Sequence, residues 1–232
     1  SDLKQVSSKQ EYSRNSAKSS SLPDLRKYPS GTPRKKAFLR TVMPYITSQN
    51  AAITAERNWL ISKQYQGQWS PAERARLKDI AKRYKVKWSG NTLKIPWNTL
   101  LERVDIIPTS MVATMAAAES GWGTSKLARN NNNLFGMKCM KGRCTNAPGK
   151  VKGYSQFSSV KESVSAYVTN LNTHPAYSSF RKSRAQLRKA DQEVTATAMI
   201  HKLKGYSTKG KSYNNYLFAM YQDNQRLIAA HM

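Results

Sequence analysis

The chain has 232 residues, of which 39 are Lys or Arg and 13 are Asp or Glu, so its formal net charge at pH 7 is +26. This length allows one hydrophobic core with appendages, and no apolar run is long enough to cross a membrane as a helix. The charge is spread along the chain and favours polyanionic partners, but no zinc-finger, RNP or helix-turn-helix pattern indicates specific recognition of nucleic acid.

The first part of the chain is predicted to be a flexible leader followed by helices. Residues 1–33 are rich in Ser, Lys and Pro, a composition that disfavours a packed core. Apolar residues from Arg34 to Ser62 keep helical spacing with an interruption at Pro44, which predicts one kinked helix or two. Ser70-Pro71-Ala72-Glu73 combines a capping Ser, a Pro at the first helical position and a Glu three residues after the cap, so a second helix is expected to run to about Tyr84.

Residues 111–138 carry the clearest candidate for chemistry. Glu119 falls on the same helical face as the apolar residues Met111, Val112, Met115 and Ala116. Loss of water there disfavours the charged form of a carboxyl group, and the negative end of the helix dipole acts in the same direction. Gly121 and Gly123 can end this helix just after Glu119. A carboxyl group kept protonated suits a general acid, and a structural Glu bonded to backbone or to a basic side chain is the alternative.

The segments around this helix complete the expected order of elements. A helix is predicted from Trp97 to Ile107, ending at Pro108, and Thr109 or Ser110 is expected to cap the helix that carries Glu119. Glycines separate short apolar segments between Leu134 and Phe157, a pattern that predicts an antiparallel hairpin or three short strands.

The last third of the chain is predicted to be helical. Ser158 or Ser159 caps a helix that ends near Pro175, with Glu162 in its first turn. Shorter helices are expected over 183–189 and 192–203, and the last helix is expected from about Tyr213 to Ile228.

Several motifs resemble one enzyme family. The run Ala118-Glu119-Ser120-Gly121-Trp122-Gly123-Thr124-Ser125-Lys126-Leu127-Ala128, followed by Asn132-Asn133-Leu134-Phe135-Gly136-Met137-Lys138, resembles the signature of bacterial peptidoglycan-hydrolysing N-acetylglucosaminidases. Tyr154, Phe157, Ser158 and the Tyr206-Ser207-Thr208 stretch resemble that family too, so the similarity covers roughly residues 95–230.

The resemblance implies a lysozyme-like fold, mainly α with a small β-hairpin lobe, of the α+β class. We accordingly divide the chain into the leader 1–33, an N-terminal helical extension 34–94 packed on the catalytic domain, and a glucosaminidase domain 95–232. The expected activity is that of an endo-β-N-acetylglucosaminidase, with peptidoglycan glycan strands as substrate and anionic envelope polymers as further candidate partners.

A second carboxylate is hard to find. Two-carboxylate glycosidases set their acids roughly 5 to 9.5 Å apart, and many relatives are thought to place the second acid in the hairpin, yet no Asp or Glu occurs from Ser120 to Lys161. Glu162 and Asp105 are the candidates, with helix capping and surface pairing as their respective alternatives. We therefore hypothesise that the 2-acetamido group of the substrate replaces a protein nucleophile, with Tyr206 at the position where the resemblance implies a tyrosine that orients this group. An inverting reaction through a cleft-bound water is the other option.

Other side chains are candidates for substrate binding. Aromatic rings can stack on sugar faces, and amide side chains can bond to acetamide or hydroxyl groups, although most aromatic residues in such a domain belong to the core. Trp122 is also expected to pack under the helix end and shield Glu119. The candidates are Trp122, Asn133, Phe135, Tyr154, Gln156, Phe157, Tyr177 and Tyr213.

Cys139 and Cys144 suit either a disulfide-closed loop or two free thiols, and the resemblance favours the disulfide because it implies a periplasmic or secreted protein whose signal peptide has been removed. Two thiols are too few for a zinc site, the three histidines have no metal-like spacing, and we expect neither metal nor other cofactor. The enzymatic alternatives are a muramidase and a lytic transglycosylase. A noncatalytic cell-wall or polyanion binding module is the third option, and a basic nucleic-acid binder the fourth.

Overall fold

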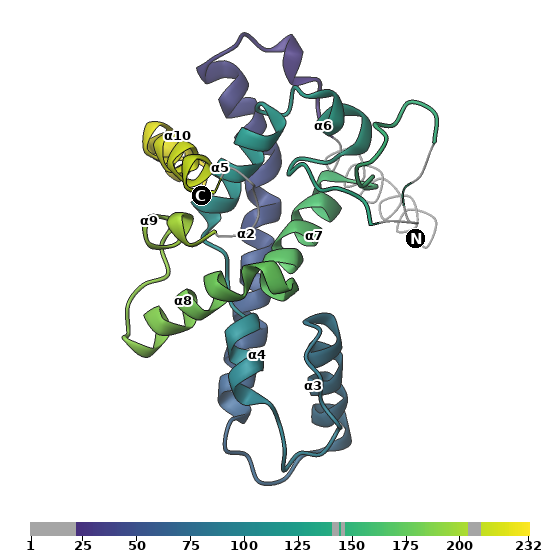
Figure 1. Cartoon of the computed structure of the whole chain (residues 1–232), viewed down its shortest axis with the longest axis vertical. Helices are drawn as coiled ribbons and strands as arrows, with labels where there is room; N and C mark the ends of the chain where they lie inside the picture. The colour runs from purple at the N-terminus through teal and green to yellow at the C-terminus, as the bar shows by residue number, and fades with distance from the viewer. Residues whose placement is uncertain (1–21, 141–143, 145–146, 204–209) are drawn as a thin grey trace, which may run out of the picture. The chain divides into compact units, whose positions relative to one another are not determined.

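The structure is a computed structural model that describes residues 22–140, 144, 147–203 and 210–232, and this part of the chain is built from helices (Figure 1). In chain order the elements are η1 (Leu25–Lys27), α2 (Thr32–Lys63), α3 (Pro71–Arg83), α4 (Trp97–Arg103), α5 (Thr109–Ser120), α6 (Lys126–Asn131), α7 (Val160–Thr173), η2 (Pro175–Tyr177), α8 (Ser178–Lys189), α9 (Ala196–Met199), η3 (Ile200–Lys202) and α10 (Lys211–Ala229). Among the described helices, none has the length and apolar character needed to cross a membrane.

Most predicted helices are present, with shifted ends. Pro44 lies inside α2, which is one helix rather than two. The predicted capping box of α3 is confirmed, because the Glu73 N–H donates to Ser70 Oγ at 3.1 Å and the Ser70 N–H donates to Glu73 Oε1 at 3.0 Å. The α4 helix ends four residues before the predicted Ile107. The Arg57 side chain donates to the carbonyls of Leu101 and Val104 at 2.5 and 3.0 Å, which satisfies the helix end there.

The predicted β-hairpin is absent, so the α+β, lysozyme-like class with a hairpin lobe is wrong. Over the described residues no strand occurs, and the one β-type pairing is an antiparallel bridge between Lys138 and Tyr154. The bridge consists of two backbone bonds, from the Ser155 N–H to Met137 O at 2.9 Å and from the Cys139 N–H to Gly153 O at 3.3 Å, and the pairing extends no further in the described residues. The pattern of short apolar segments and glycines between Leu134 and Phe157 therefore reflects an irregular loop, and the described part of the fold is helical.

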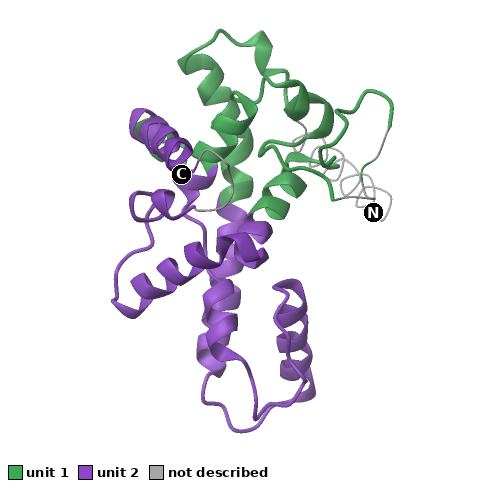
Figure 2. Cartoon of the chain, viewed as in Figure 1, with its two compact units in different colours: residues 1–46, 113–167, 226–232 green, residues 47–112, 168–225 purple. Residues whose placement is uncertain are grey.

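The chain divides into two compact units, shown in Figure 2. Unit 1 contains residues 1–46, 113–167 and 226–232, and unit 2 contains residues 47–112 and 168–225. The helices α2, α5, α7 and α10 each contribute residues to both units. The predicted boundary between residues 94 and 95 stays a prediction.

Each unit has its own buried apolar side chains. In unit 1 they include Leu25, Phe38, Leu39, Val42, Met43, Ile46, Met115, Leu134, Phe135, Val160, Val164 and Tyr167. In unit 2 they include Ile53, Leu60, Leu77, Ile80, Leu100, Val104, Ile107, Leu171, Tyr177, Phe180, Met199 and Leu217. Part of the predicted leader belongs to this packed structure, because η1 places Leu25 in the core of unit 1, whereas residues 1–21 lie outside the described residues.

Candidate active site

Glu119 lies in the last turn of α5, half-buried, within unit 1. The helix ends where predicted, because Gly121, Trp122 and Gly123 have φ of +56°, +55° and +80°, all in the left-handed region. The Trp122 N–H donates to Ala117 O at 3.0 Å, and the Gly123 N–H donates to Ser120 Oγ at 2.9 Å. These bonds fix the end of α5 and therefore the position of the Glu119 backbone.

The loop after α6 passes directly against the Glu119 carboxylate. Gly136 has φ +68°, and a Cβ added there would lie 3.3 Å from Glu119 Oε2. The missing side chain is therefore what lets this loop approach the acid. Sequence analysis did not single out Gly136, although its place in the Leu134-Phe135-Gly136-Met137 run was part of the family resemblance.

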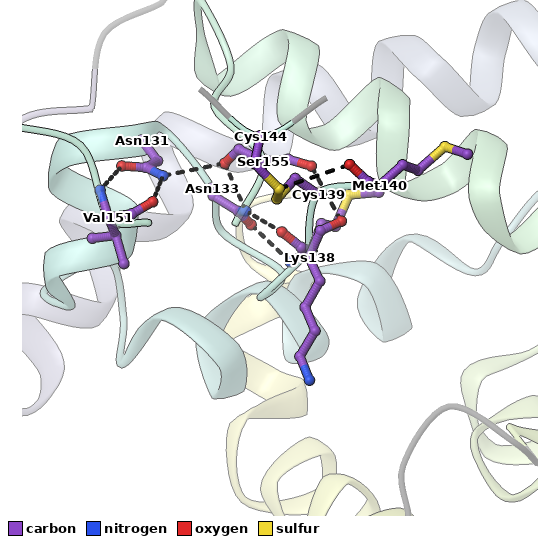
Figure 3. The surroundings of a disulfide bond; sticks show 9 residues. Asn131, Asn133, Lys138, Cys139, Met140, Cys144, Val151 and Ser155 are labelled. Atoms are coloured by element: carbon purple, nitrogen blue, oxygen red, sulfur yellow. Dashed lines mark hydrogen bonds between the residues drawn. A yellow bond between two sulfur atoms is a disulfide. The ribbon is translucent and has the colours of Figure 1, made fainter. Parts of the chain in front are cut away.

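Asn133 holds the turn that contains Gly136, and Figure 3 shows its side chain within the loop. Its side chain is 1% exposed, and its amide N–H groups donate to the carbonyls of Met137 at 2.8 Å and Ser155 at 3.0 Å. Its Oδ1 accepts from the N–H groups of Phe135 and Met137 at 3.3 and 3.1 Å. Asn133 was predicted to bind a sugar, but all its hydrogen-bonding positions are used within the loop. Its role in the structure is to position that loop.

Asn131 and Asn132 fix the far side of the same loop. Asn131 Nδ2 donates to Val151 O at 3.0 Å, and its Oδ1 accepts from the Val151 N–H at 2.8 Å, as Figure 3 shows. Asn132 ends α6 in the left-handed conformation, with φ 51°, and donates to Phe157 O at 3.0 Å. The Asn run that sequence analysis noted only as part of a motif therefore serves as a set of loop clamps.

The aromatic residues of unit 1 that were predicted to bind sugar differ in exposure. Phe135 is fully buried and stacks on Tyr167 with a 4.2 Å centroid distance, so it belongs to the core. Trp122 is half-buried, with its ring edge on Phe38 at 5.6 Å and the Lys35 ammonium over its face at 5.0 Å.

The remaining residues of unit 1 that were predicted to bind sugar lie at the end of the loop. Tyr154 and Phe157 are half-buried, whereas Gln156 is exposed. The Phe157 N–H donates to Asn131 O at 2.8 Å, and Tyr154 forms the bridge to Lys138. These three side chains therefore belong to the loop that contacts Glu119, and they remain partly accessible to a substrate.

The other predicted site residues belong to unit 2 or lie outside the description. Tyr177 is 2% exposed in unit 2, and Tyr213 is half-buried in the first turn of α10. Tyr206 lies outside the described residues.

Asp105 is buried among arginines of unit 2 rather than paired at the surface as sequence analysis expected by default. The side chain is 1% exposed and accepts hydrogen bonds from Arg188 at 2.8 and 2.9 Å, with Arg57 and Arg184 nitrogens at 3.5 and 3.9 Å. Burial is the largest influence and raises the pKa of Asp105, but the Arg188 hydrogen bonds and the charges of Arg184 and Arg57 hold it below its ordinary value on balance. This carboxylate is fully engaged by guanidinium groups.

Arg184 connects this cluster to the backbone. It is completely buried, and it donates to the carbonyls of Glu102, Asp105 and Ile106 and to Asn172 Oδ1 at 2.7 to 3.2 Å. Burial lowers the pKa of Arg184 to about 10, against the opposing effect of Asp105. The group stays charged at neutral pH, so the cluster is an ionic core of unit 2.

Glu162 acts as a helix cap. Its Oε2 accepts from the Ser158 N–H at 2.7 Å and from the Ser158 hydroxyl, while its own N–H donates to Ser159 Oγ at 3.1 Å. This is the capping role that sequence analysis gave as the alternative for Glu162.

The predicted disulfide between Cys139 and Cys144 is confirmed, with a Cα–Cα distance of 5.4 Å (Figure 3). It closes a short segment of the loop whose other end is held by Asn133. In the described part of the chain, no group of three or more His, Cys, Asp or Glu side chains is arranged to hold a metal ion.

Comparison with known proteins finds one family. The family model named Glucosaminidase, described as mannosyl-glycoprotein endo-beta-N-acetylglucosaminidase, matches residues 96–226, more than half of the chain. The matched range contains Glu119, Gly136 and the loop that its asparagines hold. No solved structure matches the chain.

Proposed function

Because the chain belongs to the glucosaminidase family of glycosidases, we propose that it cleaves the β-1,4 bonds that follow N-acetylglucosamine in peptidoglycan, with Glu119 as the general acid. The observation that carries this proposal is the close approach of the Gly136 backbone to the Glu119 carboxylate. This contact fixes the loop against a half-buried carboxyl group, and a general acid has to be held in position in this way.

The proposed mechanism needs one protein carboxyl group. Glu119 donates its proton to the glycosidic oxygen as the bond from that oxygen to the anomeric carbon breaks. The carbonyl oxygen of the 2-acetamido group attacks the anomeric carbon, and the ionised Glu119 then removes a proton from the water that opens this cyclic intermediate. Asp105 and Glu162 are both engaged in structural roles, which supports a mechanism without a second protein acid.

Side chains around the loop would complete the site. Tyr154, Gln156 and Phe157 belong to the loop that contacts Glu119, and their exposure suits contacts to a glycan. Tyr206 is assigned the orientation of the acetamido group on the family resemblance alone. The disulfide supports a periplasmic or secreted location, where thiols are oxidised and peptidoglycan is present.

Digestion of purified peptidoglycan tests the assignment. The parent and Glu119→Gln are incubated with the polymer, and the soluble products are reduced with borohydride and identified by mass spectrometry. We expect fragments ending in N-acetylglucosaminitol from the parent and a loss of rate of roughly 10²- to 10⁴-fold in the variant. Glu162→Gln is the matched control, because it removes a carboxylate that only caps a helix.

Other products would change the assignment. Reduced muramic acid ends indicate a muramidase, and anhydro-muramic ends indicate a lytic transglycosylase. If neither protein releases fragments at any salt concentration or pH while both bind the polymer, the chain acts as a noncatalytic wall-binding module.

A further inference from the structure

Residues 56–97 of unit 2, which we call the arm, carry a large excess of positive charge. The arm comprises the end of α2, the whole of α3 and the segment that leads into α4. It contains ten Lys and Arg residues but only three acids. All three acids are already paired inside the arm, with Glu56 and Asp79 on Arg83 and Glu73 on Lys63.

Most of the remaining cations of the arm face solvent. Within the described residues these side chains form no ion pair, so their charge is available to an external anion. The exposed cations with neither an ion pair nor a ring contact are Arg74, Lys78, Lys82, Lys85, Lys87 and Lys94.

The same arm exposes large apolar side chains. Tyr65 is 94% exposed, Leu93 is 87% exposed and Ile61 is 47% exposed. Tyr65 and Leu93 each lie four residues before a tryptophan, and these two tryptophans, Trp69 and Trp97, have ring centroids 6.3 Å apart. The two exposed side chains therefore come from neighbouring segments, which meet at the lower end of α3 and α4 in Figure 1.

Tyr65 also has an unusual backbone. Its φ is +73°, a conformation that residues with bulky side chains rarely adopt. The ring is almost fully exposed, so contacts of this ring within the protein do not account for the strain. The left-handed conformation instead ends α2, two residues after Lys63, as is common at helix C-termini, and it leaves the ring exposed.

We propose that the arm binds the surface of a bilayer that contains anionic phospholipids. The exposed lysines contact the phosphates, and Tyr65, Leu93 and Ile61 enter the boundary between headgroups and acyl chains. Aliphatic side chains gain from this apolar boundary but cannot stack on bases or sugars.

A nucleic-acid partner fits the arm less well. Single strands bind on exposed aromatic faces, but Trp59 and Trp69 pack against one another at 6.2 Å, and the Arg76 guanidinium covers the face of Trp59 at 4.4 Å. Of the three large exposed apolar side chains of the arm, Ile61 and Leu93 are aliphatic and Tyr65 is aromatic, so the arm offers a nucleic acid little to stack on.

Vesicle sedimentation with the full chain tests this proposal. Vesicles of phosphatidylcholine, with and without phosphatidylglycerol, are mixed with the parent and with Lys85→Gln/Lys87→Gln. We expect binding only to the anionic vesicles, weakened by salt, and a loss of affinity of roughly thirtyfold in the double variant. Lys182→Gln/Lys189→Gln removes the same charge from exposed positions on α8 and should change affinity less than about threefold.

The apolar contribution is tested with variants that keep the charge. Tyr65→Gly removes the ring and relieves the backbone strain, so its melting temperature should not fall, yet its vesicle affinity should drop roughly tenfold. Leu93→Ser should behave alike in binding, while Tyr216→Ser, which alters another exposed side chain, should bind as the parent does.

Three outcomes would overturn the proposal. They are equal binding to neutral and anionic vesicles, parent-like binding of both Tyr65→Gly and Leu93→Ser, and a preference for a single-stranded oligonucleotide over vesicles that depends on Lys85 and Lys87. Glu119→Gln should retain vesicle binding, because the readout does not depend on glycan cleavage.

Discussion

Replacing Gly136 with Ala should disturb Glu119 through one added methyl group. The new Cβ would lie 3.3 Å from Glu119 Oε2, close enough that the carboxylate has to move by a few tenths of an ångström. Because a misplacement of about 1 Å can lower the rate roughly 100-fold, we expect kcat to fall about 3- to 10-fold. The left-handed φ of +68° adds a loss of unfolding free energy of about 1–2 kcal/mol for a residue with a side chain.

Gly149→Ala separates these two effects. Gly149 has φ +79°, but nothing lies within 4 Å of its added Cβ, so the backbone cost is retained without the contact to Glu119. We expect similar losses of unfolding free energy in both variants, measured by chemical denaturation. Only Gly136→Ala should lose kcat in a peptidoglycan release assay well below both melting temperatures. Equal kcat values for the two variants would refute the idea that the Gly136 backbone positions the acid.

Three further predictions concern stability. Gly123 has φ +80°, and the Cβ added in Gly123→Ala would collide with the Leu25 side chain. Chemical denaturation should therefore show a loss of unfolding free energy of about 2–5 kcal/mol. A loss below about 1 kcal/mol would contradict the packing described. Asp105→Asn leaves buried guanidinium charges unbalanced and should cost about 3–5 kcal/mol at pH 7. Folding lowers the pKa of Asp105, so its contribution to the unfolding free energy is present above the unfolded pKa of about 4 and is lost as the pH falls through the folded pKa. The stability of Asp105→Asn should therefore change less between neutral and acidic pH than that of the parent. The double variant Cys139→Ser/Cys144→Ser should lose about 2 kcal/mol of unfolding free energy, and a reducing agent should lower the melting temperature of the parent but not of this variant.

Features encoded by neighbouring residues could be predicted from the sequence. The cap of α3 depends on Ser70, Pro71 and Glu73 within one turn, and the end of α5 depends on Gly121 and Gly123, so both follow from local rules. The disulfide likewise joins residues only five positions apart.

Features that depend on distant partners could not be predicted. The partners of Asp105 in α8 lie 79 to 83 positions away, and no local pattern indicates that the chain buries Arg184 beside it. The β-hairpin predicted for the loop after α6 is wrong for a related reason. Its glycines and short apolar runs are typical of strands, but the backbone pairing is limited to one bridge, and the buried amide of Asn133 holds the loop by a bond across 22 positions to Ser155.

The catalytic role of Glu119 stays a prediction, but the helix that carries it could be predicted from local residues. Glu119 was identified from its helical face and from the family resemblance, and the helix that carries it has the predicted end. Gly136 was missed because its importance lies in a tertiary contact of its backbone, which sequence spacing does not reveal.

Because the loop depends on amide side chains, deamidation can damage it. Hydrolysis of the Asn133 amide would release ammonia and replace two N–H donors with a carboxylate oxygen. That oxygen would face the carbonyls of Met137 and Ser155, which can only accept hydrogen bonds. One spontaneous chemical event would thus open the loop beside Glu119 while the gene stays unchanged. The time since synthesis, as well as the fold, therefore determines how well the acid is held in place.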